Sequence, residues 1–203
     1  MNSTTKEKDK NTAITTCVIL ASGYSKRFGS NKLLANLNSK SIFEYVISTT
    51  LPLFDKLIVV TRYNDIEKYC INNDIPVIMH NEPFKSDTIF LGTVYLEQFN
   101  PASITFFQAD QPLISKTSIL EILSISEKNP DKIIRASFNE IEGSPILFPK
   151  RYFGDLQLLP ENKGGNYIVK NHPEDVILSK VPNHYELLDI DTPDDLLILS
   201  NYI

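Results

Sequence analysis

The sequence contains few of the residues from which disulfide frameworks and metal centres are built. It has two cysteines, three histidines and no tryptophan among 203 residues. Cys17 and Cys70 lie far apart, so they form neither a disulfide framework nor a four-ligand metal site, and they are typical of a reducing cytoplasm. His80, His172 and His184 lack the spacing of metal ligands, and we assign them no role from the sequence.

Positive charge and long apolar runs are also scarce. The 20 Lys and Arg residues are outnumbered by 25 Asp and Glu residues, which gives a formal net charge of −5. General nucleic-acid binding needs a basic surface, so we expect no nucleic-acid partner, and any anionic ligand must be held by a local cluster of cations. No run approaches the roughly 20 apolar residues of a membrane span, so we expect no membrane partner. Residues 1–13 are polar and lack the apolar stretch of a signal peptide, which predicts a disordered tail on a cytoplasmic protein.

What the sequence does contain is a regular alternation of apolar runs and helical stretches. We expect buried strands at 13–22, 56–62, 76–80 and 103–110. We expect helices at 42–50, 65–73, 88–99, 115–128 and 194–202, and an antiparallel pair of strands at 133–138 and 145–149. This order indicates βαβ units. It predicts one domain over residues 14–203, a three-layer αβα fold with a mostly parallel, Rossmann-like sheet.

The loop after the first expected strand combines flexible, hydroxyl-bearing and cationic residues. Residues 20–32 hold two glycines, three cations and three serines. Glycine lets the backbone approach a ligand closely, Arg27 can contact two phosphate oxygens at once, and Lys32 offers a compact charge. Ligands of open α/β sheets bind at the carboxyl ends of the strands. The loop therefore predicts a polyphosphate site, although an ordinary solvated turn would have a similar composition.

The spacing of the two glycines excludes two common phosphate-binding motifs. Five residues separate Gly23 from Gly29, and Ser30 follows, whereas a Walker A loop needs four residues and then a lysine. The dinucleotide fingerprint needs Gly-x-Gly, but Ser25 stands two residues after Gly23. A nicotinamide dehydrogenase is therefore the least favoured of the enzyme classes considered.

Two aspartates are candidates to meet this loop. Asp110 ends the fourth expected strand, and Asp191 follows a further candidate strand at 185–190. Two carboxylates from distant segments, with phosphate oxygens, are the ligands that Mg²⁺ takes beside a nucleotide. Each residue also has an ordinary structural explanation, since Asp110 suits a turn before Gln111 and Asp191 lies where a helix N-cap is expected.

Four blocks of the chain resemble motifs of one enzyme superfamily. Leu20-Ala21-Ser22-Gly23-x-Ser25-x-Arg27-Phe28-Gly29-x-x-Lys32 resembles the nucleotide-binding signature of GT-A-like nucleotidyltransferases, which has Ala and Met at the positions of Ser22 and Phe28. The other blocks are 108–112 (QADQP), 143–145 (GSP) and 189–196 (DIDTPDDL). In this order they resemble most the molybdenum cofactor cytidylyltransferase family, within the MobA-like NTP transferase superfamily.

The resemblance implies a role for particular residues. Arg27, Lys32 and Asp110 would be catalytic, and Asp110 and Asp191 would hold Mg²⁺, with Asp191 preferred over Asp189. The nucleotide-binding set would be Leu20, Ala21, Ser22, Gly23, Ser25, Arg27, Gly29, Lys32 and Thr88. Thr88 is included because Thr88-Ile89-x-x-Gly92 resembles the family's Ser-Leu-x-x-Gly, although by itself Thr88 suits a helix N-cap.

The implied reaction is nucleotidyl transfer, in which an acceptor phosphate attacks the α-phosphorus of a nucleoside triphosphate and pyrophosphate leaves. CTP is the expected nucleotide, because in the family Leu-Ala-Ala-Gly goes with cytidine and Leu-Ala-Gly-Gly with guanosine. The expected acceptor is molybdopterin carrying molybdenum, and a molybdoenzyme apoprotein would be a further partner.

One block departs from the family. Where the family has Gly-Asp-x-Gly-Ala-Arg, this chain reads ENKGGN at 161–166, so the acidic residue and the arginine are displaced or lost. The change concerns the acceptor more than the nucleotide. It leaves open a sugar or polyol phosphate as acceptor, or a non-catalytic accessory protein that binds a nucleotide or pterin.

Overall fold

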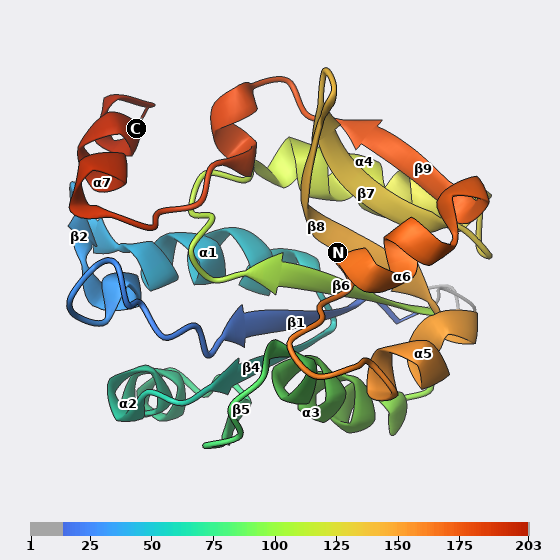
Figure 1. Cartoon of the computed structure of the whole chain (residues 1–203), viewed down its shortest axis with the longest axis horizontal. Helices are drawn as coiled ribbons and strands as arrows, with labels where there is room; N and C mark the ends of the chain where they lie inside the picture. The colour runs from blue at the N-terminus through green and yellow to red at the C-terminus, as the bar shows by residue number, and fades with distance from the viewer. Residues whose placement is uncertain (1–13, 203) are drawn as a thin grey trace, which may run out of the picture.

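A seven-stranded sheet forms the centre of the computed structural model, which describes residues 14–202 (Figure 1). The strand order is β5-β4-β1-β6-β8-β7-β9. The strands are β1 (Thr16–Ala21), β4 (Lys56–Thr61), β5 (Val77–Met79), β6 (Ser103–Gln108), β7 (Ile133–Phe138), β8 (Ile141–Pro149) and β9 (Val176–Lys180). Only β8 runs antiparallel to its neighbours in this sheet, so the expected mostly parallel sheet is confirmed. A separate two-stranded hairpin joins β2 (Asn36–Leu37) to β3 (Lys40–Ser41).

Helices cover both faces of this sheet and complete three layers (Figure 1). One face packs against α1 (Ile42–Thr50), α2 (Asn64–Asn72), α4 (Lys116–Lys128) and α7 (Pro193–Leu199). The other face packs against α3 (Lys85–Glu97), α5 (Phe153–Gln157) and α6 (Asn166–Asn171). Ile19 of β1 belongs to the first core and Val18 to the second, and all six residues of β1 are buried. Burial on both faces explains why this strand is apolar without alternation.

Helix α3 lies unusually close to β1 because it carries a glycine at the contact. A Cβ atom at Gly92 would lie 2.6 Å from Cγ1 of Val18, which is closer than packed carbon atoms approach. The helix begins at Lys85, three residues before the expected start, because the Asp87 carboxylate accepts a hydrogen bond from the backbone N–H of Phe84 (2.9 Å). Thr88 therefore lies within the helix and is not its N-cap.

The strand expected at 185–190 is wrong. Residues His184–Leu187 form a 3₁₀ helix, and the backbone then extends without joining the sheet. The reason is the buried Glu186, whose carboxylate accepts hydrogen bonds from the N–H of Ser115 (2.9 Å) and the hydroxyl of Ser118 (2.7 Å). These contacts bind the segment to the beginning of α4. The outermost strand of the sheet, next to β7, is instead β9. Four of its five residues are exposed or half-buried, and the sequence pattern did not predict it.

Two further expectations concern thiols and membranes. Both cysteines are buried and free, and burial raises the pKa of Cys70 to about 12 and that of Cys17 well above its ordinary value, so neither is a thiolate at neutral pH. Along residues 14–202 no helix combines the length and apolar character needed to cross a membrane. The disordered tail predicted for residues 1–13 lies outside the described residues.

Candidate active site

The loop after β1 folds over the carboxyl edge of the sheet. It contains two residues with left-handed backbone, Ser25 (φ +49°) and Gly29 (φ +79°), which turn the chain back toward the sheet. The Tyr63 hydroxyl, beyond the end of β4, donates to the carbonyl of Gly23 (2.5 Å) and so fixes the first part of the loop. At the end of the loop the Asn31 side chain accepts a hydrogen bond from the N–H of Leu33 and caps the 3₁₀ helix Lys32–Leu34.

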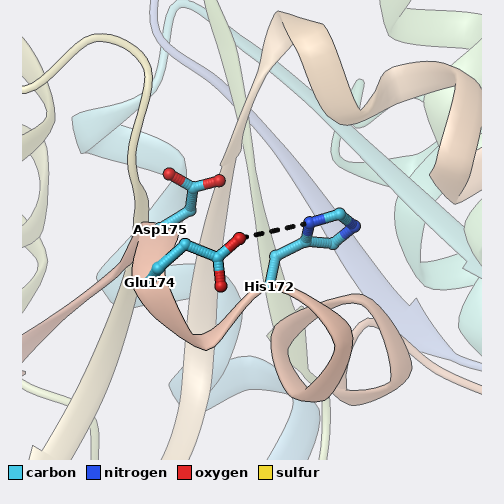
Figure 2. A group of neighbouring side chains, drawn as sticks. All are labelled: His172, Glu174 and Asp175. Atoms are coloured by element: carbon cyan, nitrogen blue, oxygen red, sulfur yellow. Dashed lines mark ion pairs between the residues drawn. The ribbon is translucent and has the colours of Figure 1, made fainter.

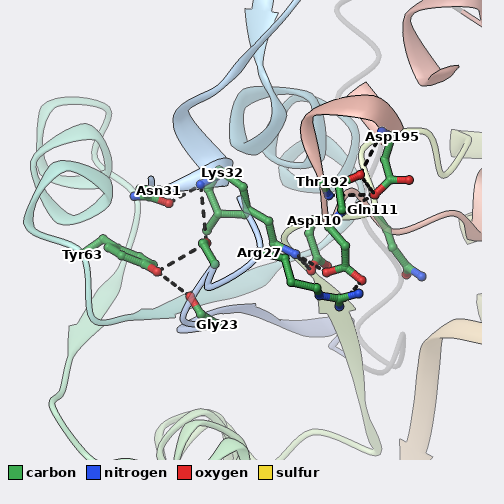
Figure 3. A network of polar contacts seen from close by, with 12 residues as sticks. Gly23, Arg27, Asn31, Lys32, Tyr63, Asp110, Gln111, Thr192 and Asp195 are labelled. Atoms are coloured by element: carbon green, nitrogen blue, oxygen red, sulfur yellow. Dashed lines mark hydrogen bonds and ion pairs between the residues drawn. The ribbon is translucent and has the colours of Figure 1, made fainter. Parts of the chain in front are cut away.

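Lys32 is the centre of the charged cluster that this loop forms. Figure 3 shows the side chains of Lys32 and Arg27 extending toward Asp110, away from Tyr63. Nζ of Lys32 lies 2.7 Å from Oδ2 of Asp110 and 2.9 Å from Oδ1 of Asp191, and its side chain is only 7% exposed. Burial alone would lower the pKa of Lys32, but the two carboxylates raise it, so the ammonium stays charged.

Arg27 completes the cluster from the solvent side. Its Nη2 lies 2.5 Å from Oδ2 of Asp191, while its side chain is 70% exposed and therefore accessible to a ligand. Partial burial would raise the pKa of Asp191, but Lys32 and Arg27 hold it below its usual range. Two of the three cations of the loop, Lys32 and Arg27, thus meet the two predicted acids at the carboxyl edge of the sheet.

Backbone contacts bring Asp191 to Asp110 across the sequence. The backbone N–H of Ile190 donates to the carbonyl of Asp110 (2.9 Å). Nε2 of the Gln111 side chain donates to the backbone carbonyl of Leu187 (3.1 Å). The turn after β6 therefore holds the segment that carries the distant acid. This is why Asp191 reaches the site although no strand delivers it.

The helix that follows holds this segment from the other side. Thr192 is the N-cap of α7, and its hydroxyl and the Asp195 carboxylate form a reciprocal capping box. Asp195 also accepts a hydrogen bond from the N–H of Asp191 (2.9 Å). Figure 3 shows Thr192 and Asp195 beside Gln111. A helix cap is present in the expected region, but the N-cap is Thr192 and not Asp191, and it orients the acid directly before it.

A third carboxylate, Asp189, faces the same region. Its side chain is exposed, but the surrounding protein and the charge of Asp110 raise the pKa of Asp189 to about 6. Repulsion between neighbouring carboxylates is relieved by a hard divalent cation, for which carboxylate oxygens are the preferred ligands. By the chemistry of their donor atoms, Asp110 and Asp191 could hold a divalent cation, with Asp189 nearby.

Two adjoining cavities open at this edge. The first, of about 490 Å³, lies between the loop, the beginning of α3 and the ends of β4 and β6. The second, of about 610 Å³, lies between β8, residues 162–166 and residues 187–191. Both are lined by Arg27, Lys85, Asp110 and Asp191, so the charged cluster stands at their junction. The arrangement suits two anionic ligands that react with each other.

A buried histidine connects two of the predicted nucleotide-binding residues at the first cavity. Nε2 of His80 lies 2.8 Å from Oγ of Ser22 and 3.2 Å from Oγ1 of Thr88. The Ser22 hydroxyl also donates to the carbonyl of Val60 (3.1 Å). Burial lowers the pKa of His80, so the ring is neutral at pH 7, and its Nε2 shares a hydrogen bond with the Ser22 hydroxyl. The sequence showed no sign of this role beyond the position of His80 after the third strand.

The sequence analysis also did not predict a stacked pair of side chains beside the loop, Tyr24 and Arg62. The Arg62 guanidinium lies 3.9 Å from the centre of the Tyr24 ring, and the ring is half exposed. Nε of Arg62 donates to the carbonyl of Ser22 (2.6 Å), which ties this pair to the end of β1. Both side chains line the first cavity and present a planar, polarisable surface of the kind on which bases stack.

The altered block contacts a buried arginine in the second cavity. Arg135 of β7 donates from Nη1 to Oδ1 of Asn166 (2.9 Å) and to Oε2 of Glu142 (2.8 Å). Asn166 stands at the arginine position of the Gly-Asp-x-Gly-Ala-Arg motif that this block resembles. The Arg135 guanidinium, which comes from β7, therefore lies beside Asn166 in the lining of the second cavity.

Most residues predicted for the site line the cavities. The first cavity includes Leu20, Ser22, Gly23, Ser25, Arg27, Lys32, Thr88, Asp110 and Asp191. Ala21 does not line either cavity, because side chains alternate along β1 and this one is buried in the core with α1. Gly29 is likewise absent from both linings, and its positive φ gives it a role in the turn of the loop.

A second cluster of potential metal ligands lies elsewhere. Figure 2 shows the Glu174 carboxylate directed toward His172, and Asp175 lies beside them. Nδ1 of His172 and Oε1 of Glu174 are 3.8 Å apart. The Asp175 carboxylate is already bound by Lys132 (2.9 Å), Arg151 (2.6 Å) and the Tyr152 hydroxyl (2.7 Å). Its negative charge is therefore neutralised without a metal ion, and the cluster is explained as an ion-pair network.

Comparison with known proteins agrees with this geometry. Residues 17–176 match the family described as the MobA-like NTP transferase domain. The chain is 28% identical over 201 residues to the probable molybdenum cofactor guanylyltransferase of Aquifex aeolicus, covering 97% of this chain and 95% of the relative. It is 25% identical over 183 residues to the molybdenum cofactor cytidylyltransferase of Escherichia coli, covering 89% and 93%. Rv0371c of Mycobacterium tuberculosis H37Rv shares the fold, with a TM-score of 0.80, 20% identity and coverage of 94% and 99%.

Proposed function

The chain belongs to the MobA-like NTP transferase family and is a nucleotidyltransferase, and from this premise we propose that it joins the nucleoside monophosphate of CTP to a molybdopterin-type phosphate. The observation that carries the proposal is the contact of Lys32 with both Asp110 and Asp191 at the junction of two cavities. A single binding site would need only one cavity. Two cavities that share a charged junction suit the transfer of a group from one anionic substrate to another.

In the proposed mechanism the protein aligns two anions that repel each other. A bond forms between an oxygen of the acceptor phosphate and the α-phosphorus, and the bridging bond to the β-phosphate breaks, so pyrophosphate leaves. The attacking oxygen is already negative, so no general base is needed. Lys32, Arg27 and the loop backbone would bind the triphosphate and neutralise the charge that develops on the leaving group.

Asp110 and Asp191 would hold Mg²⁺, with Asp189 beside them. When bound, the ion would neutralise phosphate charge and hold the triphosphate in one geometry. The protein's contribution is to bring the carboxylates together. Asp110 follows β6, and Asp191 lies in the segment that the Ile190 hydrogen bond anchors. The raised pKa of Asp189 supports a site at which negative charge is in excess until a cation binds.

The choice of CTP over GTP is supported by Ser22. Its side chain occupies the position that is glycine in the guanosine form of the motif, and it is held in place by Val60 and His80. A side chain fixed at this point leaves less room for a base than glycine would, which favours a pyrimidine. The curated relatives include both guanylyltransferases and a cytidylyltransferase, so the nucleotide must be measured.

Pyrophosphate release tests the proposal directly. The full chain is incubated with Mg²⁺, each of the four triphosphates in turn, and one of three acceptors: molybdenum-loaded molybdopterin, a sugar phosphate or a polyol phosphate. We expect release with CTP and the molybdopterin acceptor, and the product would then pass to a molybdoenzyme apoprotein. Release only with a sugar or polyol phosphate would assign a different acceptor, for which the altered 161–166 block allows.

The same experiment separates catalysis from simple binding. If calorimetry shows that the folded protein binds a nucleotide tightly, but no acceptor gives pyrophosphate, the chain is a nucleotide-binding accessory protein and the proposed reaction is wrong. A mixture without acceptor is the control for slow hydrolysis of the triphosphate.

A further inference from the structure

Lys85 is a cation at the junction of the two cavities that belongs to none of the resembling motifs. It is the first residue of α3 and lines both cavities. A Cβ atom at Gly164 would lie 3.3 Å from Cε and 3.4 Å from Cδ of Lys85, so the stem of the lysine lies across the altered block. The missing side chain at position 164 leaves room for it.

Lys85 also differs from Lys32, Arg27 and Arg135, because within residues 14–202 it has no ion-pair partner. Lys32, Arg27 and Arg135 each lie within 3 Å of a carboxylate oxygen. Within residues 14–202 the ammonium of Lys85 has neither an ion pair nor a hydrogen bond, and Asp110 and Asp189 act on it only at longer range. Its side chain is nevertheless open to the solvent of the cavities. A ligand can therefore reach this charge.

The surroundings of Lys85 make an anionic ligand favourable. The walls of the cavities remove part of the water around the ammonium, and this burial lowers the pKa of Lys85. A charge that has lost water and has no partner is costly, and an anion that pairs with it recovers that free energy. The position at the junction selects which anion: one that lies where both cavities meet.

We propose that Lys85 binds the attacking phosphate of the acceptor and draws it toward the α-phosphate of the nucleotide. The proposal rests on the proposed function and adds a residue to it. Lys32 and Arg27 bind the triphosphate from the loop side, so Lys85 is free to neutralise the second anion. It takes no part in proton transfer: the attacking oxygen forms the new bond to the α-phosphorus as pyrophosphate leaves.

Steady-state kinetics of Lys85→Met, Lys85→Arg and the matched control Lys116→Met test this role. Lys116 is an exposed lysine at the first position of α4. For Lys85→Met we expect a fall in kcat on the order of 10²-fold and a raised KM for the acceptor, because an electrostatic contact to the reacting phosphate is lost. The Kd for CTP should stay near the wild-type value. Lys85→Arg should restore part of kcat, and Lys116→Met should change nothing.

Two outcomes of these kinetics would overturn the assignment. Wild-type kcat and acceptor KM in Lys85→Met would show that the lysine does not contact the reacting groups. A loss of CTP affinity as large as the loss of kcat would make it a triphosphate ligand. The Tm should not fall in Lys85→Met, because an unpaired, partly desolvated charge is removed; a large fall would indicate a structural role.

A binding experiment keeps this inference separate from the proposed function. Inorganic phosphate is titrated by calorimetry onto wild type and Lys85→Met, each saturated with a non-hydrolysable CTP analogue and Mg²⁺. Weaker phosphate binding in Lys85→Met supports the assignment even if wild type transfers no nucleotide to any acceptor. Equal phosphate binding in both proteins overturns it even if wild type is active.

Discussion

Two charged clusters lie at opposite edges of the same sheet and differ in how their charges are satisfied. Asp175 precedes β9 and lies at the amino edge, where Lys132, Arg151 and Tyr152 all bind its carboxylate. Asp110 follows β6 and lies at the carboxyl edge, where it shares Lys32 with another carboxylate. One carboxylate with three donors is closed to ligands, whereas carboxylates that must share a cation are not.

The pKa values express the same contrast. Lys132, Tyr152 and Arg151 hold the pKa of Asp175 well below its usual range. At the other edge, the surrounding protein and the charge of Asp110 raise the pKa of Asp189 to about 6. Clusters of acidic and basic residues are common on proteins, so composition alone does not identify a site. Ionisable groups beside a cavity whose pKa values are strongly shifted, such as Asp189, do identify a candidate site.

The largest effect should come from removing a charge at the carboxyl edge. Asp110→Asn is expected to lower kcat on the order of 10²-fold or more, because it removes a proposed metal ligand and one of the two carboxylates that contact Lys32. Pyrophosphate release under saturating CTP and acceptor measures it. Because Asn can still occupy the turn, the Tm should change little. A fall in kcat that only follows a loss of folded protein would count against a role in the reaction.

A smaller effect should come from the wall of the first cavity. Ser22→Gly removes the side chain that His80 and Val60 hold, and it is expected to shift the ratio of kcat/KM for CTP and GTP toward GTP by about 10-fold or more. Parallel assays with the two nucleotides give this ratio. If Ser22→Gly slows both nucleotides equally, Ser22 supports the fold of the loop and does not read the base.

The amino-edge cluster should respond in the opposite way. Asp175→Asn removes the shared partner of Lys132 and Arg151, so we expect a lower Tm with kcat and KM unchanged. Thermal unfolding followed by circular dichroism, together with the pyrophosphate assay, measures both. A loss of activity with an unchanged Tm would show that the Asp175 cluster also contributes to function, and the two clusters would then not differ in role.

The smallest effect concerns the titration of Asp189. Its folded pKa of about 6 exceeds its ordinary value of 3.8, so between these values the folded protein keeps a proton that the unfolded chain has lost. The contribution of this group to stability therefore decreases as pH rises from about 4 to 6. Carboxyl-carbon NMR of the metal-free protein should show a midpoint near 6.

Two changes sharpen this measurement. Asp110→Asn should lower the midpoint, because the charge of Asp110 is one cause of the shift, and added Mg²⁺ should lower it further. A midpoint near 4 in the metal-free wild type would mean that the acids at the carboxyl edge are as well satisfied as Asp175.

Local patterns predicted the loop and its strand well. β1 is buried on both faces, so its apolar run was readable, and the cations that follow it could be placed at the carboxyl edge. The same pattern placed Asp110 after β6. Prediction failed at 185–190, where the deciding contacts join Glu186 to Ser115 and Ser118, about 70 residues away. The hydrophobic pattern of a short segment gives no information about a contact so distant in the sequence.

By itself the sequence determined the three-layer class of the fold, the glycine-containing cationic loop and the family to which both belong, because these depend on short-range patterns of burial and charge. Only the tertiary structure decided that Asp191 pairs with Lys32 and that His80 holds Ser22. It also decided that Lys85 has no ion-pair partner within the part of the chain that the structure describes. Each of these depends on which backbone groups and side chains meet across the sheet edge. Packing and long-range hydrogen bonds determine these contacts, and the local sequence does not.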